Sequence, residues 1–79
     1  MRVLLFASLR EKAGAAELTL ELTSDATVAA ARSALLDRLP ILNGRLDRIA
    51  WAVNRSYANL EMALHENDEL ALLPPVSGG

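Results

Sequence analysis

Two apolar runs, one near each end of the 79-residue chain, constrain its fold more than any other feature. The first lies within residues 2–7 and the second is Leu70–Leu73. A strand without apolar–polar alternation is typical of one that is covered on both faces. We therefore expect the two runs to lie side by side in the centre of one sheet. They would be parallel, because the segments between them cross over the sheet.

Alternating residues predict shorter strands between these two runs. Leucines at positions 18, 20 and 22 alternate with polar residues and predict a half-buried edge strand, after a loop over residues 10–16. Ile49, Trp51 and Val53 alternate with alanines and predict a third strand. A short edge strand is expected to begin near Tyr57, and a polar turn over residues 65–69 leads into the last run.

A helix is predicted between the second and third strands. Thr27 is expected to cap its start, because a threonine hydroxyl accepts a hydrogen bond from a free helical N–H. Pro40 disfavours helical geometry at Leu39 and marks the end, and one further helical turn is expected around Leu46. The apolar face of the helix would consist of Val28, Ala31, Leu35, Leu36 and Leu39.

The resulting element order is β, β, α, β, short β, β. We expect an α+β fold of the β-grasp, or ubiquitin-like, type: a mixed sheet of four to five strands with one main helix packed across one face. A ferredoxin-like fold is the main alternative, but it needs a second full helix that residues 54–66 do not supply. The chain is expected to form one domain over residues 1–73, followed by an extended flexible tail over residues 74–79.

The composition excludes most kinds of side-chain catalysis. The chain has no cysteine, which removes disulfides, thiolate metal sites and thiol nucleophiles. Its one histidine, His65, lies in a polar turn without a second ligand candidate, so we expect a surface residue and no metal site. Lys12 is the only lysine, and no role is assigned to it.

The charge pattern and the hydrophobic pattern exclude two classes of partner. Eight basic and ten acidic residues give a net charge of −2 without any basic block, which argues against nucleic-acid binding. The first apolar run is far shorter than the ~20 residues that a membrane-spanning helix needs. The start of the chain resembles a secretory signal, but charged residues at positions 10–12 interrupt it. We therefore expect a cytoplasmic protein that binds no membrane.

The last six residues are Pro74-Pro75-Val76-Ser77-Gly78-Gly79, directly after a predicted central strand. The prolines favour extended backbone and would stiffen the base of a projecting arm, which could reach ~20 Å. The final glycines lack Cβ atoms and could enter a channel too narrow for other residues. The α-carboxylate of Gly79 would then be the distinctive group at the tip. Simple fraying of a glycine-rich end is the alternative interpretation.

Three stretches of the sequence resemble the small, sulfur-carrying subunits of molybdopterin synthase, which belong to the ubiquitin-like sulfur carriers. They are residues 6–11 (FASLRE) with Gly14 after them, residues 52–54 (AVN), and residues 67–70 (NDEL) running on to the terminal PPVSGG. Together they span essentially the whole chain, and the terminal hexapeptide is the most specific part.

This resemblance implies a carrier whose reactive group is its own C-terminus. An ATP-dependent activating enzyme, related to ubiquitin-activating adenylyltransferases, would adenylate Gly79, and a sulfur donor protein would convert it to a thiocarboxylate. Gly78 and the residues before it would thread the tail into a large subunit, where the sulfur passes to cyclic pyranopterin monophosphate. The catalytic side chains would belong to that subunit, in a heterotetramer. ATP serves the activating enzyme, and the carrier itself would bind no cofactor.

The resemblance also implies a docking patch beside the tail, at Phe6, Tyr57 and Leu73. The residues alone leave open whether Phe6 belongs to the core or to this patch. Arg10 and Glu11 match a family pair near the same edge, although an exposed ion pair between them is the simpler interpretation. Carriers for thiazole or cysteine synthesis, ubiquitin-like modifiers and a non-covalent β-grasp binding module stay open as alternatives.

Overall fold

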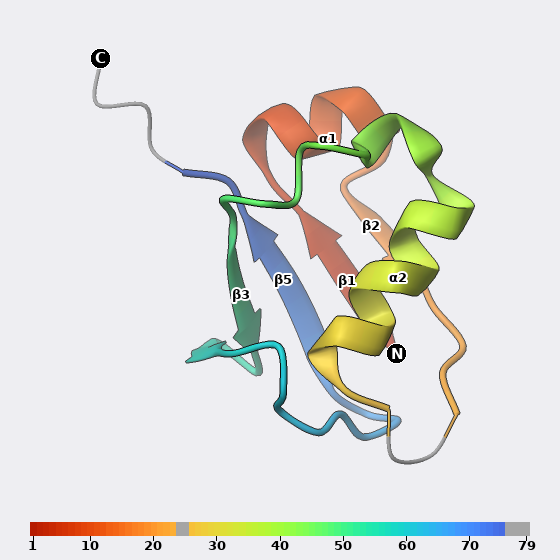
Figure 1. Ribbon diagram of the computed structural model, residues 1–79, viewed down its shortest axis with the longest axis vertical. Coiled ribbons are helices and arrows are strands. Elements are labelled where there is room, and N and C mark those ends of the chain that lie inside the picture. Colours follow the sequence, from red (N-terminus) through yellow and green to blue (C-terminus); the bar gives the residue numbers. More distant parts are fainter. Residues whose placement is uncertain (24–25, 76–79) are drawn as a thin grey trace.

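The computed structural model describes residues 1–23 and 26–75, and Figure 1 shows their arrangement. Five strands form one sheet in the order β2-β1-β5-β3-β4. In chain order the elements are β1 (Arg2–Leu5), α1 (Ala7–Ala13), β2 (Glu17–Thr19), α2 (Val28–Arg38), the 3-10 helix η1 (Pro40–Leu42), β3 (Ala50–Val53), β4 (Ser56–Ala58) and β5 (Glu69–Leu73).

The two apolar runs form the central, parallel pair of the sheet. Strands β1 and β5 pair in parallel, with Val3 opposite Leu70 and Leu5 opposite Leu72. The other three strand pairs are antiparallel. The predicted β-grasp arrangement is therefore confirmed, and the ferredoxin-like alternative is wrong, because residues 54–66 hold β4 and loops in place of a second full helix.

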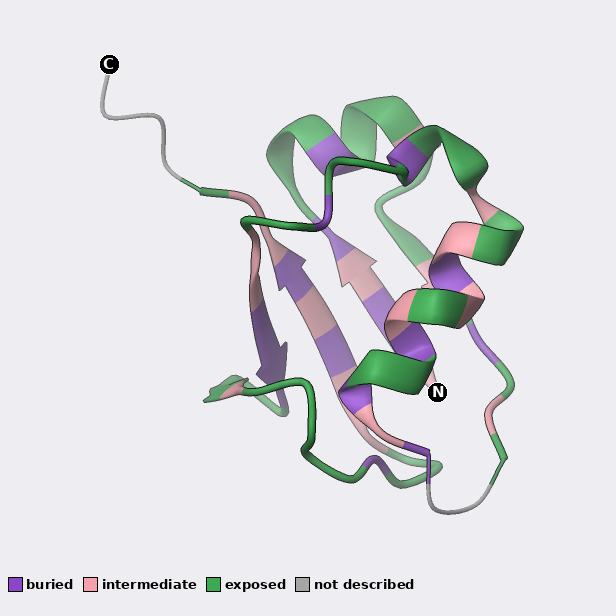
Figure 2. Ribbon diagram, viewed as in Figure 1, coloured by how far each residue is buried: buried purple, intermediate pink, exposed green. Residues whose placement is uncertain are grey.

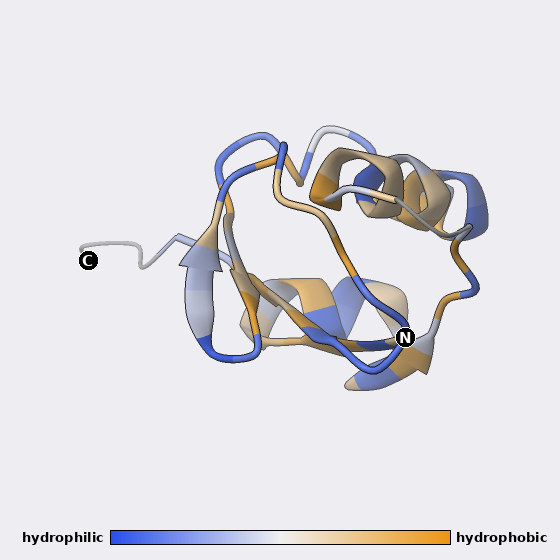
Figure 3. Ribbon diagram, turned by 90° about the horizontal axis from the view of Figure 1, so that it is seen from below, coloured by the Kyte–Doolittle hydropathy of each residue, from blue (hydrophilic) through white to orange (hydrophobic). Residues whose placement is uncertain are grey.

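Helix α2 packs across one face of the sheet, and the core lies between them. Figure 3 shows α2 set off to one side of the sheet. Its buried residues are Val28, Ala31 and Leu35. Fully burying one side chain of leucine size contributes roughly 1.5–3 kcal/mol. The strand residues that belong to the same core cluster are Val3, Leu5, Trp51, Val53, Leu70 and Leu72.

The start of α2 is capped as the sequence predicted. The Ala30 N–H donates to the Thr27 hydroxyl oxygen at 3.3 Å. The Val28 N–H donates to the carbonyl of Met62 at 3.0 Å, and the next N–H donates to another carbonyl of the same loop. The free donors of the first helical turn are thereby satisfied by a side chain and by a crossing loop.

Helix α1 was not predicted. The first strand ends at Leu5, and residues 7–13, expected as strand and loop, form a short helix that ends at Gly14 with φ +76°. Leu9 is its one buried residue, so seven residues with a single apolar anchor show no helical periodicity. The turn expected around Leu46 is also wrong, since the helical turn follows Pro40, whose ring favours the first position of a helix.

The expectation that both apolar runs are covered on both faces is wrong as well. Burial alternates along β1 and β5, as Figure 2 shows by its alternating colours. Leu4, Ala71 and Leu73 point away from α2 and are only half-buried. Helix α1 packs on η1 and not over these residues. The second face of the sheet's centre is therefore left open by the described part of the chain.

Candidate functional site

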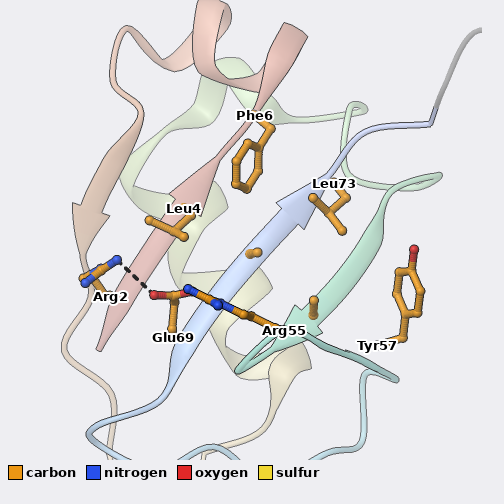
Figure 4. A pocket seen from close by; sticks show the side chains of 9 residues that line it. Arg2, Leu4, Phe6, Arg55, Tyr57, Glu69 and Leu73 are labelled. Atoms are coloured by element: carbon orange, nitrogen blue, oxygen red, sulfur yellow. Dashed lines mark ion pairs between the residues drawn. The ribbon is translucent and has the colours of Figure 1, made fainter.

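The open face of the sheet contains a hollow of about 450 Å³, which we call the open-face hollow (Figure 4). It extends over β1, β5, β3 and β4 and reaches the point where β5 ends. The residues that line it are Arg2, Leu4, Phe6, Ala52, Arg55, Tyr57, Glu69, Ala71 and Leu73.

Strand register explains why the surface is hollowed here. Leu4 is opposite Ala71 on β5, Ala71 is opposite Ala52 on β3, and Ala52 is opposite Tyr57 on β4. These four residues form one row across four strands, on the same face of the sheet. The two middle positions carry only methyl groups, so the row is low in its centre and high at its ends. The hollow is thus a direct consequence of two alanines in register.

Two aromatic side chains and one leucine form the walls near the end of β5. Figure 4 shows Phe6 on one side of Leu73 and Tyr57 on the other. Phe6 directly follows β1 and is 42% exposed, and Tyr57 lies on the edge strand and is 80% exposed. Exposed apolar surface gathered in one hollow marks a binding site more strongly than the same residues scattered singly.

The other end of the hollow is polar. The Arg2 guanidinium forms an ion pair with Glu69 at 2.9 Å and with Glu17 at 3.0 Å. Arg55 comes from the β3–β4 turn, and none of the ion pairs found among residues 1–23 and 26–75 includes it. Since both Glu17 and Glu69 pair with Arg2, the charges at this end balance, and Arg55 is the one charged side chain lining the hollow that forms no ion pair among residues 1–23 and 26–75.

A hydrogen-bonded clamp holds the start of β5 against the β3–β4 turn. The Asn54 side-chain nitrogen donates to Asp68 Oδ1 at 2.8 Å, and the Glu69 N–H donates to Asn54 Oδ1 at 3.0 Å. The His65 N–H donates to Asp68 Oδ2 at 2.8 Å. The bond from His65 and then that from Asn54 lower the pKa of Asp68, because both stabilise its ionised form. The clamp therefore fixes the register of the strand that leads to the tail.

The structure brings three of the predicted docking residues together and separates the other two from them. Phe6, Tyr57 and Leu73 all line the open-face hollow, so Phe6 is not a core residue. Arg10 and Glu11 are exposed on α1 and line no part of it. No ion pair joins them in the described part of the chain, contrary to the simpler interpretation.

The tail begins directly beside the hollow. Pro74 is half-buried and Pro75 is exposed. The predicted roles of Val76, Ser77, Gly78 and Gly79 concern residues outside those described. His65 and Lys12 are exposed. Across residues 1–23 and 26–75 no group of three or more acidic or histidine side chains is placed to hold a metal ion, and no helix there is long and apolar enough to cross a membrane.

Sequence reasoning missed the floor and the polar end of the hollow. Leu4, Ala52 and Ala71 looked like ordinary strand residues, and Arg55 looked like part of a turn. The signal that could have found them is the register itself, because alanines opposite each other in two strands predict a depression. In the sequence, Asn54 and Asp68 appeared only within two of the stretches that resemble the family, and nothing showed that they pair. Asn and Asp at turn positions nevertheless favour such side-chain hydrogen bonds.

The parallel central pair, the crossing helix and the open apolar face beside the C-terminal strand define a β-grasp protein of the ubiquitin-like type. The chain belongs to the ThiS family, whose sequence profile matches residues 3–79. Its role is that of a sulfur carrier, and proteins of this family have no catalytic site of their own.

Two named groups occur among the similar proteins. The molybdopterin synthase sulfur carrier subunit of Arabidopsis thaliana is 35% identical over 79 residues, which are 100% of this chain and 82% of that protein. Small archaeal modifier protein 1 of Haloferax volcanii is 41% identical over 83 residues, covering 95% of each chain. A crystal structure of SAMP1 from Haloferax volcanii has a TM-score of 0.92 at 40% identity and covers 99% of this chain and 97% of that one.

One structural neighbour is part of a complex. It is a chain in the protein–protein complex of subunits 1 and 2 of the molybdopterin-converting factor from Helicobacter pylori. Its TM-score is 0.71 at 25% identity, over 99% of this chain and 96% of that one. That neighbour therefore has the same fold and forms a complex with a second subunit.

Proposed function

We propose that this chain is the sulfur carrier subunit of a molybdopterin synthase, and that the carboxylate of Gly79 is the group that carries the sulfur. One observation carries the proposal. The open-face hollow, with Phe6 and Tyr57 as its exposed walls, ends at the last strand residue before the Pro-Pro-Val-Ser-Gly-Gly tail. A fixed apolar face at the base of a glycine-ended tail is what a carrier needs if other proteins are to orient that tail.

The proposed chemistry has three steps before transfer. An ionised carboxylate is a poor electrophile, and the ordinary pKa of a C-terminal carboxyl, ~3.5, keeps it ionised near neutral pH. In the first step a carboxylate oxygen of Gly79 attacks the α-phosphorus of ATP, which forms an acyl adenylate and releases pyrophosphate. In the second the terminal sulfur of a persulfide on a donor protein attacks the acyl carbon, AMP leaves, and an acyl disulfide to the donor forms. In the third a protein thiolate attacks the donor-side sulfur of that disulfide, which releases the thiocarboxylate of Gly79 and leaves a disulfide between the two protein sulfurs.

The last step takes place in a partner. We propose that the tail enters the large synthase subunit, with Pro74, Pro75, Val76, Ser77 and Gly78 as the threaded segment. The thiocarboxylate sulfur is transferred there to cyclic pyranopterin monophosphate, and two such transfers form the dithiolene of molybdopterin. Lysine and other acid–base groups for this step belong to the large subunit. The assembly would be a cytoplasmic heterotetramer.

The same hollow serves the docking step in this proposal. Phe6, Tyr57 and Leu73 offer apolar area that a partner would remove from water, at roughly 25 cal/mol per Å². Aromatic anchors in a pocket are the residues that usually dominate binding energy at such interfaces. The name of the Arabidopsis relative and the two-subunit complex of the Helicobacter neighbour support this branch of the family.

Mass spectrometry tests the chemistry directly. The native chain, incubated with its activating enzyme, ATP and a sulfur source, should gain the mass of one oxygen-to-sulfur exchange, located at Gly79 by fragmentation. A chain with one alanine added after Gly79 is the matched control, and it should fold normally but gain no sulfur. The loaded chain should then convert cyclic pyranopterin monophosphate only with the large subunit present. A mass change elsewhere, or loading of the extended control, would contradict the proposal.

A second candidate is a protein modifier, which the similarity to small archaeal modifier protein 1 favours. Activation of Gly79 would be the same, but the acceptor would be a lysine amine and the product an isopeptide. Affinity isolation of an epitope-tagged chain from its own cells distinguishes the two. Conjugates linked through Gly79 would support the modifier, and an unconjugated chain that copurifies with the large subunit would support the carrier.

A further inference from the structure

The two edges of the sheet differ in whether the chain itself covers them. At the β2 edge, Met1 and Leu20 exchange two main-chain hydrogen bonds of 2.9 Å. By antiparallel alternation, the N–H and C=O of the neighbouring Thr19 then point away from β1. The Arg38 guanidinium from the end of α2 donates to this outward carbonyl. Arg38 thus uses the Thr19 carbonyl, which would otherwise be free to accept a hydrogen bond from a strand of another protein.

The β4 edge carries no such cover. The Asn54 N–H donates to the Glu69 carbonyl at 2.8 Å, so the main-chain groups of Asn54 face β5 and those of Val53 face β4. Val53 is opposite Ser56, which makes this pair the hydrogen-bonded one. The next residue, Tyr57, is at a non-bonded position, and its N–H and C=O point outward. In the described part of the chain no other group bonds to them.

Arg55 is the turn residue directly before β4, and Figure 4 shows its side chain on the same face as Tyr57 but extended across the hollow toward Glu69. The two residues are two apart in the chain, and both side chains line the open-face hollow (Figure 4). Arg55 has φ +71° after Asn54 at +50°, and a turn of this kind favours glycine at the second position. The chain keeps an arginine at a strained position, where its guanidinium lines the hollow and belongs to no ion pair among residues 1–23 and 26–75. Such strain points to a role for the side chain.

We infer that the β4 hairpin binds an extended segment of the large subunit as an added strand. The outward N–H and C=O of Tyr57 pair with the main chain of that segment. Side chains two apart on the added strand share a face, so one apolar side chain enters the hollow and an acidic side chain two residues away meets Arg55. The inference rests on the proposed function, because the strand comes from the large subunit proposed above.

Amide hydrogen exchange tests the main-chain part without any substitution. The Tyr57 amide should exchange rapidly in the free carrier and at least about tenfold more slowly in the complex. Wild-type binding is measured first. If the large subunit does not bind, the proposed function fails and the inference fails with it. If it binds and the Tyr57 amide is not slowed, only the inference is overturned. If exchange of the Tyr57 amide in the carrier alone becomes slower as the carrier concentration rises, the β4 edge binds a second copy of the carrier. That result would also overturn the inference.

A pair of charge reversals tests the acidic contact. Arg55→Glu should weaken binding of the large subunit about tenfold or more, as expected for a charge-assisted hydrogen bond. Arg45→Glu changes the net charge equally at an exposed turn that does not line the hollow, and should alter binding less than about twofold. Circular dichroism confirms that both variants are folded. Equal weakening by the two substitutions, or none by Arg55→Glu, would overturn the acidic contact.

Discussion

Replacing Arg55 by glycine should make the isolated carrier more stable. Arg55 has φ +71°, a conformation that costs a residue with a Cβ atom about 1–2 kcal/mol and costs glycine nothing. Glycine, however, gains freedom in the unfolded chain, which offsets about 0.5–1 kcal/mol of that benefit. The side chain of Arg55 is exposed and forms no ion pair among residues 1–23 and 26–75, so its removal forfeits little else. The net gain is about 0.5–1 kcal/mol.

Thermal and denaturant unfolding can resolve a change of this size. For a domain of this length 1 kcal/mol corresponds to a shift of about 4–8 °C, so Arg55→Gly should raise Tm by roughly 2–8 °C. Arg45→Gly is the matched control, because Arg45 does not have a positive φ and glycine there should lower stability by roughly 0.5–1 kcal/mol. If Arg55→Gly is no more stable than wild type, the assignment of strain to this turn is wrong. The same variant should bind the large subunit more weakly, a trade of function for stability.

Three further predictions concern the hollow, the clamp and the helix cap. Tyr57→Ser should weaken binding of the large subunit about tenfold, whereas Ile41→Ser, which removes another exposed apolar side chain on the helical side, should change it by less than about twofold in the same titration. Asp68→Asn should lower the free energy of unfolding by about 1 kcal/mol near neutral pH, because one donor then faces an amide nitrogen. The pKa of Asp68 is lowered in the folded state, so the stability that its carboxylate contributes is complete above the ordinary pKa of 3.8 and is lost as the pH falls below that value. The difference in unfolding free energy between Asp68→Asn and wild type should therefore shrink in acid. A difference that does not change with pH would refute this account. Thr27→Ala should cost about 1 kcal/mol in denaturant unfolding, and a cost near zero would mean that the carbonyls of the crossing loop suffice as a cap.

The pairing of β1 with β5 and the helix α2 could be predicted because the residues that form them act through local properties: their own hydrophobicity and bonds to near neighbours in the chain. Leu70 and Leu72 must be buried wherever the strand lies. Thr27 caps its helix through a hydrogen bond to Ala30, only three residues further along the chain. Helix α1 could not be predicted, because its single buried residue, Leu9, depends on packing against η1. The local pattern of seven residues contains no trace of that long-range contact.

The open face could not be predicted for a different reason. A continuous apolar run shows that both faces of a strand avoid water, but it does not show what covers each face. In β5 the inward residues are buried by the chain's own helix, while Ala71 and Leu73 on the other face stay half-buried. The run alone predicted cover on both faces, and only the resemblance to a family pointed to an exposed docking patch at Phe6, Tyr57 and Leu73. The same apolar pattern arises when the second cover is another protein.

Strand β5 joins the stability of the fold to the position of the tail. Its inward residues, Leu70 and Leu72, complete the core, its outward residues line the hollow, and its end leads into Pro74. A register slip of one residue would turn the leucines of the core outward and move the tail's origin by ~3.3 Å. The clamp between Asn54 and Asp68 opposes such a slip at the far end of the strand. A substitution in the clamp should therefore impair sulfur transfer even where the chain remains folded, because the tail would begin at the wrong place relative to a docked partner.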